Sequence, residues 1–325
     1  MMSMKAIQIA HTGGPEVLDF VDLPIPTPKA GEALIKVHAS GVNFIDIYLR
    51  EGRYKIPLPF VNGQEAAGIV EAVGEGVTEF QPGDAVAWCN VVGTYAEYAV
   101  APADKLVPLP EGIDLRLAAA VMLQGMTAHY LVHSTFPLKK GDTALVHAAA
   151  GGVGLLLTQM ATQIGARVIA TVSTEEKAKL AREAGAAETI LYTQEDFEAR
   201  TRELTEGRGV DVVYDSVGKT TFEKSLNVLR PRGLVALFGA SSGAVPPFDL
   251  IELSGKGSLY VTRPTLKHYV LTREELLSRA KDVLEAVNSG RLKVRTEHDY
   301  PLAQAAQAHL DLEGRKTTGK VLLIP

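Results

Sequence analysis

The sequence predicts an α/β protein that combines a partly open β-barrel with a doubly wound parallel sheet. Three observations lead to this prediction. The first third carries short β-like runs separated by Gly and Pro, the middle alternates strands with helices, and a glycine cluster follows the first strand of that alternation. The 325 residues suffice for two domains that each bury a core.

The first third is typical of a curled antiparallel sheet. Apolar and β-branched residues gather in short runs, of which residues 5–9, 33–39 and 68–73 are examples. Gly and Pro stand between these runs, as at Gly74 and Pro24, and mark turns. Many short strands with such punctuation favour a barrel or partial barrel.

From about Gly141 the pattern becomes strand, helix, strand, helix, which predicts a parallel sheet covered on both faces. Thr174 is a suitable helix N-cap and Gly185 a suitable C-terminal glycine. We expect strands at residues 143–148, 167–172, 189–191, 210–214, 234–238 and 258–262, and helices at residues 152–164, 174–185, 196–206 and 221–229.

After Thr265 the alternation stops. Two amphipathic helices at 274–287 and 303–312 precede a closing strand at 320–324, and this tail is able to return to the N-terminal part. A further helix is expected to begin at Gln124 and to span both domains. The predicted division is therefore 1–123 with 266–325 for the barrel domain, and 124–265 for the doubly wound domain.

Composition narrows the range of partners. The net charge is −5 and the isoelectric point about 5.9, so neither nucleic acid nor an anionic membrane is an expected partner. The apolar stretch at 144–172 is interrupted by polar residues and glycines and is not a membrane span. Cys89 is the single cysteine, so no internal disulfide forms, and we expect a cytoplasmic protein.

The glycine cluster indicates a nucleotide-binding turn. The expected strand leads into Ala149, Ala150, Gly151, Gly152, Val153 and Gly154. Set against G-x-G-x-x-G, Ala149 replaces the first glycine, Gly151 lets the backbone approach a pyrophosphate, and Gly154 permits close packing of helix on strand. The N-terminus of the following helix favours an anion. Tight packing without any ligand is the alternative explanation of these glycines.

The end of the second strand of this alternation predicts which dinucleotide is bound. An NAD enzyme usually places Asp or Glu there, whereas this chain has Val172 and Ser173. Ser173 can hydrogen-bond a 2′-phosphate, and Lys177, one turn into the next helix, can neutralise it. This favours NADPH. In the alternative interpretation, Ser173 is only a turn residue and Lys177 a solvated charge.

The whole chain resembles the medium-chain dehydrogenase/reductase superfamily, and within it the zinc-independent, zeta-crystallin-like quinone oxidoreductases. The resemblance implies a GroES-like catalytic domain, a Rossmann domain, a cofactor cleft between them, and a homodimer or tetramer. It rests on Gly13-Gly14-Pro15-Glu16-Val17-Leu18, Gly41-Val42-Asn43-Phe44-Ile45-Asp46, Gly63-Gln64-Glu65-Ala66-Ala67-Gly68, residues 148–154, Tyr214-Asp215-Ser216-Val217-Gly218, residues 257–264 and Thr318-Gly319-Lys320-Val321.

The resemblance makes missing metal ligands informative. The zinc enzymes of this superfamily carry Cys and His where this chain has Asn43 and Gln64, and the third ligand position falls near Gln124. Cys89 alone cannot complete a zinc site, which needs three or four ligands around one point. We therefore expect no metal, and a hydride transfer from NADPH that proceeds without a Lewis acid.

The same family segments imply five residues for the nicotinamide and the substrate: Asn43, Asp46, Tyr48, Tyr54 and Gln64. Asn43 and Gln64 are expected to face the cleft as hydrogen-bond donors, and Tyr48 to donate to a quinone oxygen or stack on its ring. Alternatively, the two tyrosines only close the small domain, and Asp46 only caps or orients the local helix.

The expected cofactor residues lie mostly where strands of the doubly wound sheet end. Tyr192 is placed to cover the adenine side, and Arg263 to contact phosphate or, alternatively, to form an ion pair. Lys320 comes from the closing tail. The full set is Thr127, Gly151, Gly152, Val153, Gly154, Ser173, Lys177, Tyr192, Ser216, Phe238, Gly239, Ser241, Arg263 and Lys320.

The predicted function is a zinc-free NADPH:quinone oxidoreductase that transfers hydride or single electrons to small quinones. An NADPH-dependent reductase of alkenals or enones is the nearest alternative, because it shares the hydride step and differs only in the acceptor. A nucleic-acid-binding or structural protein on the same fold is a third possibility, against which the acidic charge balance argues.

Overall fold

The structure is a computed structural model that describes residues 2–325; Met1, which opens the expected first domain, lies outside the described residues. The chain forms two compact units. Unit 1 comprises Met1–Met126 and Val270–Pro325, and unit 2 comprises Thr127–Tyr269. The division differs from the predicted one at both ends: residues 124–126 belong to unit 1, and residues 266–269 to unit 2. Each unit is described by itself.

Unit 2 contains one parallel sheet with the strand order β11-β10-β9-β12-β13-β14. Numbered within the sheet this order is 3-2-1-4-5-6, which is the Rossmann order, so the doubly wound prediction is confirmed. The strands are β9 (Thr143–Val146), β10 (Arg167–Val172), β11 (Glu188–Leu191), β12 (Val210–Asp215), β13 (Leu229–Leu237) and β14 (Tyr260–Thr262).

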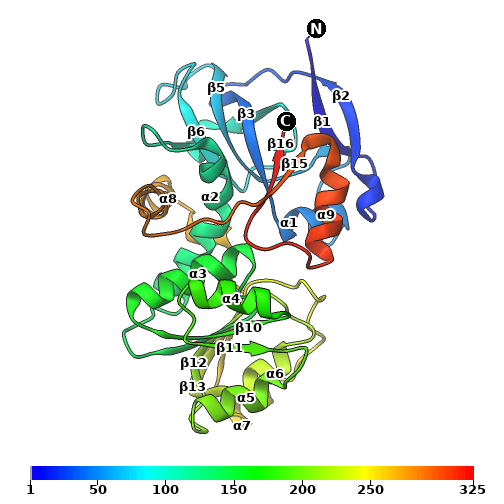
Figure 1. Cartoon of the computed structure of the whole chain (residues 1–325). Coiled ribbons are helices and arrows are strands. Elements are labelled where there is room, and N and C mark those ends of the chain that lie inside the picture. The colour runs from blue at the N-terminus through cyan, green and yellow to red at the C-terminus, as the bar shows by residue number, and fades with distance from the viewer. Residues whose placement is uncertain (1) are drawn as a thin grey trace. The chain divides into compact units, whose positions relative to one another are not determined.

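Helices cover both faces of this sheet, with α3 and α4 on one side and α5 and α6 on the other (Figure 1). Their inward side chains form a core with those of the strands, including Leu145, Ile169, Val213 and Phe222. The helical elements are α3 (Gly152–Ile164), α4 (Glu175–Glu183), α5 (Phe197–Leu204), α6 (Phe222–Asn227), α7 (Ile251–Gly255), a π-helical turn (Leu131–Thr135) and a 3₁₀ turn (Leu266–Tyr269).

Local sequence signals explain where these helices begin and end. The hydroxyl of Thr174 accepts from Lys177 N at 3.3 Å, as its predicted N-cap role requires. Asp196 caps α5 by accepting from Glu198 N at 3.0 Å. Gly165 ends α3 with φ of 93°, a left-handed conformation that glycine adopts without strain.

Unit 1 contains two sheets, and its strands are antiparallel apart from the pair β15 and β16. One sheet has the order β2-β1-β4, and the other β15-β16-β3-β5-β6-β8 with β7 also on β3. The strands are β1 (Ser3–Ile9), β2 (Asp19–Pro24), β3 (Glu32–Val42), β4 (Phe60–Val61), β5 (Glu65–Val73), β6 (Ala85–Cys89), β7 (Tyr98–Pro102), β8 (Val107–Pro108), β15 (His298–Pro301) and β16 (Val321–Ile324).

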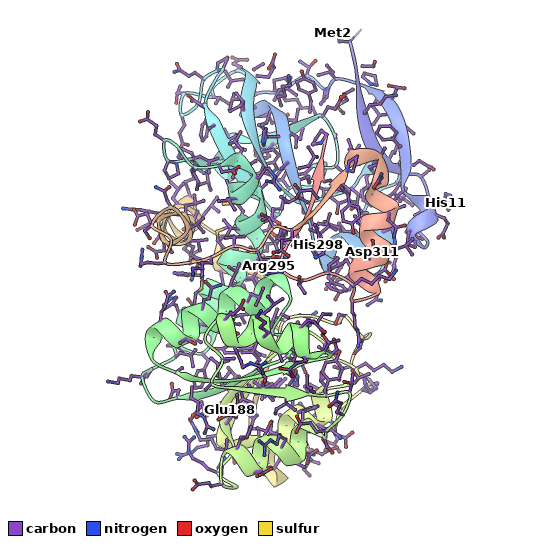
Figure 2. All side chains as sticks on the ribbon, viewed as in Figure 1. Met2, His11, Glu188, Arg295, His298 and Asp311 are labelled. Carbon is purple, nitrogen blue, oxygen red and sulfur yellow. The ribbon has the colours of Figure 1, made fainter. Side chains whose placement is uncertain are left out.

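The tail completes unit 1, as expected. β16 pairs with β3, so the last strand of the chain enters the sheet of the first third. Figure 2 labels Arg295 on the segment before β15, His298 at the start of β15, and Asp311 on α9. The helical elements of unit 1 are α1 (Phe44–Arg50), α8 (Arg273–Asn288), α9 (Ala305–Glu313), three 3₁₀ turns (Pro15–Val17, Ala103–Lys105 and Leu302–Gln304) and most of α2 (Leu115–Tyr130), within which the division into units falls.

Several expected boundaries differ from the structure; the strand expected at 234–238, for example, is β13 and begins at Leu229, and two other differences have a local explanation. The helix predicted to begin at Gln124 begins at Leu115, because the side chain of Asp114 accepts from Arg116 N at 2.7 Å and starts the helix earlier. The first Rossmann strand ends at Val146 rather than Ala148, since Ala148 has a φ of 51° and already belongs to the turn.

Within residues 2–325, every helix falls short of the length and apolar character that crossing a membrane requires.

Candidate active site

The carboxyl ends of all six strands in unit 2 meet at one edge of the sheet, where ligands of such folds bind. Most of the predicted cofactor residues lie at this edge. Residues 151–154 follow β9, Ser173 follows β10, Tyr192 follows β11, Ser216 follows β12, Phe238, Gly239 and Ser241 follow β13, and Arg263 follows β14. Thr127 is different: it lies on α2 and is buried.

The glycine turn after β9 is shaped for a phosphate group. Gly151 is the N-cap of α3 and has no side chain to occupy the N–H groups of the first turn. A Cβ added to Gly154 would lie 2.5 Å from the carbonyl oxygen of Ala148, so only glycine allows the helix to approach the turn this closely. The turn therefore fits a dinucleotide pyrophosphate.

The end of β10 lacks the acidic residue that would hold a ribose 2′-hydroxyl. Ser173 stands there instead, half-buried, and its carbonyl oxygen accepts from Thr193 Oγ1 at 2.9 Å. Lys177 lies in the first turn of α4 and is also half-buried. A hydroxyl and a nearby ammonium suit a 2′-phosphate better than a carboxylate would.

Sequence reasoning missed Asp215, a buried residue that shapes the turn after β12. Its Oδ1 accepts from Val217 N at 2.7 Å and Gly218 N at 3.0 Å. Its Oδ2 accepts from Thr221 Oγ1 at 2.8 Å and from Ser225 Oγ at 3.3 Å. The signal was available, because Asp followed by Ser-Val-Gly after an apolar strand is typical of an Asx-type turn.

His147 was also missed as a site residue. It is buried, and its Nδ1 lies 2.9 Å from Thr171 Oγ1 while its Nε2 lies 3.0 Å from Ser225 Oγ. Burial lowers the pKa of His147 below its usual value, although nearby Asp215 partly opposes the shift. The imidazole is therefore neutral and links β9 to its neighbours through hydrogen bonds.

In unit 1, Asn43 lies at the centre of a buried polar cluster. Its amide Nδ2 donates to Glu65 Oε2 at 2.7 Å and to Gly41 O at 3.3 Å. Its Oδ1 accepts from Lys320 Nζ at 2.8 Å and Gln124 Nε2 at 3.3 Å. Both amide hydrogens are used inside the protein, so the expectation that Asn43 donates to a substrate is corrected.

Lys320 is likewise placed differently from the expectation that it contacts the cofactor. Its side chain is 1% exposed and forms an ion pair with Glu65, whose other oxygen, Oε1, accepts from Leu123 N at 2.6 Å. A buried ammonium needs such a partner, because an unpaired charge in this environment is strongly unfavourable. Lys320, directly before β16, thus contacts Glu65 at the start of β5, and Glu65 in turn contacts α2 within unit 1.

Asp46 caps α1, which was the alternative interpretation of this residue. Its Oδ2 accepts from Asn43 N at 2.8 Å and Tyr95 Oη at 3.0 Å, whereas its Oδ1 has no hydrogen-bond partner among residues 2–325. Burial raises the pKa of Asp46 to about 7; Asn43 N–H, Tyr95 and the charge of Lys320 only partly offset the effect.

The chain from Asp46 continues to the surface of α9. Tyr95 Oη lies 3.1 Å from His309 Nε2, and His309 Nδ1 lies 3.1 Å from Arg50 Nη1. Arg50 is buried and forms a bidentate pair with Glu313 at 3.0 Å for both contacts. Burial and the adjacent guanidinium lower the pKa of His309 to about 3, so this imidazole is neutral too.

Three of the five expected catalytic residues lie outside this cluster. Tyr48 is on α1 with its ring 6.2 Å from that of Tyr54, and the Arg53 guanidinium stands 4.9 Å from the Tyr48 ring centroid. Tyr48 is 6% exposed and Tyr54 48% exposed. Gln64 is half-buried directly before β5. Together they offer aromatic surface, hydroxyls and an amide.

Two family models match the chain. Residues 29–111 match the alcohol dehydrogenase GroES-like domain, and residues 152–283 match the zinc-binding dehydrogenase model. A quinone oxidoreductase from Pseudomonas aeruginosa is 49% identical, with 99% of both chains covered. A 2-haloacrylate reductase from Burkholderia is 44% identical, covering 100% of this chain and 99% of that one. The solved structure of Escherichia coli quinone oxidoreductase complexed with NADPH matches with a TM-score of 0.97 at 45% identity. The match covers 99% of this chain and 100% of that one.

The chain belongs to the zeta-crystallin-like quinone oxidoreductases of the medium-chain dehydrogenase/reductase superfamily. The predicted family and fold are therefore confirmed.

A metal site requires potential ligands that are grouped in space. Among residues 2–325 no group of three or more His, Cys, Asp or Glu side chains is arranged to hold a metal ion. His129 and His133 form a pair at H-x-x-x-H spacing with ring centroids 4.5 Å apart, but a pair is short of the three ligands that zinc needs. Cys89 is buried, and burial raises the pKa of its thiol.

Proposed function

We propose that this quinone oxidoreductase reduces small quinones with NADPH and without zinc. The observation that carries the proposal is the edge of the unit 2 sheet, where the glycine turn, Ser173 and Lys177 follow two adjacent strands. The relatives support it, since the Escherichia coli quinone oxidoreductase was solved with NADPH.

The residues at the strand ends would hold the cofactor. The N–H groups of the first turn of α3 would receive the pyrophosphate, and Ser173 with Lys177 would receive the 2′-phosphate. Asp215 keeps the turn that contains Ser216 in one conformation by accepting two backbone N–H groups. Tyr192, Phe238 and Arg263 remain predicted contacts on the same edge.

For the acceptor we propose Tyr48, Tyr54 and Gln64. Bound NADPH supplies a hydride, and conjugation spreads the resulting charge over a quinone, so hydrogen-bond donors suffice for stabilisation. The exposed ring of Tyr54 offers an apolar face for stacking, the buried ring of Tyr48 lies beside it at an angle of 52°, and both hydroxyls can donate. Asn43 and Asp46 would act indirectly, by keeping the start of α1 in place.

The deciding experiment is NADPH oxidation with 1,4-benzoquinone and 9,10-phenanthrenequinone, with and without a chelator, compared with NADH. We expect turnover that prefers NADPH and is insensitive to the chelator. Detection of semiquinone by electron spin resonance separates single-electron from hydride transfer. Stoichiometric zinc by metal analysis would overturn the zinc-free part, and a preference for NADH would overturn the cofactor part.

A second candidate is reduction of an activated carbon–carbon double bond. It is supported by the 2-haloacrylate reductase that is 44% identical over the whole of this chain. The same cofactor serves both reactions, and only the acceptor differs. A panel of enones, alkenals and 2-haloacrylate, assayed beside the quinones, separates the two by their kcat/KM values.

We also propose a homodimer formed through β14. This strand is the last in the order of the unit 2 sheet, and Tyr260 and Val261 on it are exposed, as are Leu250 and Ile251 in the segment that precedes it in the sequence. An apolar edge strand pairs readily with a second copy. Light scattering should give the mass of a dimer or tetramer, and Val261→Lys should give a monomer.

A cytoplasmic location and the absence of nucleic-acid binding complete the proposal. The single cysteine and the net charge of −5 support them. Cell fractionation tests the first. Gel-shift assays at physiological salt test the second, and tight salt-sensitive binding would contradict it.

A further inference from the structure

Four buried side chains form a hydrogen-bonded chain across three neighbouring strands of unit 2. Thr171 is on β10, His147 follows β9, Asp215 ends β12, and Ser225 is on α6. The distances are 2.9 Å from Thr171 Oγ1 to His147 Nδ1, 3.0 Å from His147 Nε2 to Ser225 Oγ, and 3.3 Å from Ser225 Oγ to Asp215 Oδ2. The strands β10, β9 and β12 lie side by side in the sheet.

The carboxylate of Asp215 sets the direction of this chain. A carboxylate can only accept, so the hydroxyl of Ser225 donates its single hydrogen to Asp215. Ser225 Oγ must therefore accept a hydrogen bond from His147 Nε2–H. The imidazole Nδ1 is then unprotonated and accepts from the Thr171 hydroxyl. Each group has one role, and none can be replaced by an apolar side chain without leaving a neighbour unpaired.

Three members of this hydrogen-bonded chain lie close in sequence to turns that follow strands. His147 directly precedes the turn of Ala148, and Thr171 lies two residues before Ser173. Asp215 directly precedes Ser216. The backbone strengthens these links, since His147 N donates to Tyr214 O at 3.1 Å and Ala149 N donates to Thr171 O at 3.2 Å.

We propose that His147 is a positioning residue for cofactor binding. Through Thr171 and Ser225 it holds the glycine turn, the Ser173 turn and the Ser216 turn at the spacing that one NADPH molecule needs. The inference rests on the proposed function only in taking NADPH as the ligand. Small displacements of such turns weaken a ligand that must contact all three together.

The test is a binding titration, without any acceptor, of NADPH, NADH and the fragment 2′,5′-ADP. Losing one buried hydrogen bond should weaken binding about tenfold. Thr171→Val should weaken NADPH and 2′,5′-ADP and should lower the preference for NADPH over NADH. Ser225→Ala should weaken NADPH but leave 2′,5′-ADP within about twofold, since the Ser173 turn keeps its link.

Substitutions at His147 complete the design. His147→Phe should weaken all three ligands, and His147→Gln should recover part of the loss, because its amide presents one acceptor and one donor. Thr201→Val is the matched control: Thr201 is a buried threonine of unit 2 whose hydroxyl has no hydrogen-bond partner among the described residues. Its affinities should equal those of the unchanged protein.

Variants that lower the unfolding temperature yet bind all three ligands with unchanged affinity would overturn the inference. If His147→Phe does not fold, Thr171→Val and Ser225→Ala decide the matter alone. Unmodified protein that fails to bind NADPH would also overturn it. Unmodified protein that binds NADPH but reduces neither quinone nor enone would contradict the proposed function and leave the binding pattern as the test of His147.

Discussion

Each unit contains a buried hydrogen-bonded chain with a neutral histidine in its middle and an aspartate at its end, but a different group sets the direction. In unit 1 the donor-only guanidinium of Arg50 faces His309 Nδ1, so Nε2–H donates to Tyr95, which donates to Asp46. In unit 2 the direction is set from the other end, by the carboxylate of Asp215.

The two terminal aspartates differ in how many donors reach them. Both oxygens of Asp215 accept hydrogen bonds, including two from backbone N–H groups. Only Oδ2 of Asp46 does so, and burial raises the pKa of Asp46 to about 7. Hydrogen bonds to both oxygens offset the cost of burying a carboxyl group, and the cost is larger where one oxygen has no donor.

The largest loss of stability is expected from replacing Arg50, the buried cation in the hydrogen-bonded chain of unit 1. Arg50→Met removes a buried guanidinium together with its contacts to His309, Glu313 and Gly13 O, and should lower the free energy of unfolding by about 3–5 kcal/mol. Urea unfolding measures the change. The control is Arg182→Met, whose guanidinium is 45% exposed and should change stability by less than about 1 kcal/mol. Equal effects of the two substitutions would contradict the buried role of Arg50.

The next effect is a pH dependence. The pKa of Asp46 is raised from 3.8 to about 7, so between these values the unfolded chain loses a proton that the folded protein keeps, and stability falls as pH rises. Asp46→Asn removes the titrating carboxyl group and, with it, this fall in stability. Relative to the unchanged protein, the variant should gain about 4 kcal/mol between pH 4 and pH 8.

His309 acts in the opposite sense over the same range. Its pKa is lowered from 6.5 to about 3, so it contributes stability above pH 6.5 that is lost as the pH falls toward 3. Asp46→Asn should therefore expose a curve in which stability rises from pH 4 to pH 6.5. Parallel pH curves for the variant and the unchanged protein would show that Asp46 does not hold its proton.

A smaller change in stability is expected from Asp215→Asn, together with a change in the tautomer of His147. The amide oxygen stays with Val217 N and Gly218 N, so the NH₂ group faces Ser225 and donates to it. The direction of the chain then reverses, and His147 carries its proton on Nδ1 rather than Nε2. Nitrogen-15 chemical shifts of the imidazole report this tautomer.

The cost of Asp215→Asn should be about 1–3 kcal/mol. The comparison in unit 1 is Asp46→Asn, where Arg50 still faces His309 Nδ1 and the tautomer should stay unchanged. A reversal in both units, or in neither, would contradict the idea that different ends set the two directions.

The smallest effect is expected at the surface end of the unit 1 chain. The Glu313 side chain is 30% exposed, and Glu313→Gln retains one acceptor for Arg50. Stability should fall by about 0.5–1 kcal/mol, less than for Arg50→Met, because solvent screens the lost charge. Unfolding measured at two salt concentrations should show a smaller difference in stability between this variant and the unchanged protein at the higher concentration.

Much of the fold was predictable because its signals are local. Alternating strands and helices with a glycine turn predicted the Rossmann sheet, and the bounds of α3 and β10 agree with the expected ones. The start of α2 was missed, since the capping signal of Asp114 was not recognised. β15 was also missed, because only pairing with β16 makes that short segment a strand.

The sequence by itself determined the fold class, the glycine turn, and the absence of an acid at the end of β10, because each depends on residues close together in the chain. Only the tertiary structure decided that Lys320 pairs with Glu65, that both hydrogens of the Asn43 amide are used internally, and that His147 reaches Asp215 through Ser225. Those contacts join residues far apart in sequence. Which buried polar groups meet depends on how strands and helices pack, and no local pattern records it.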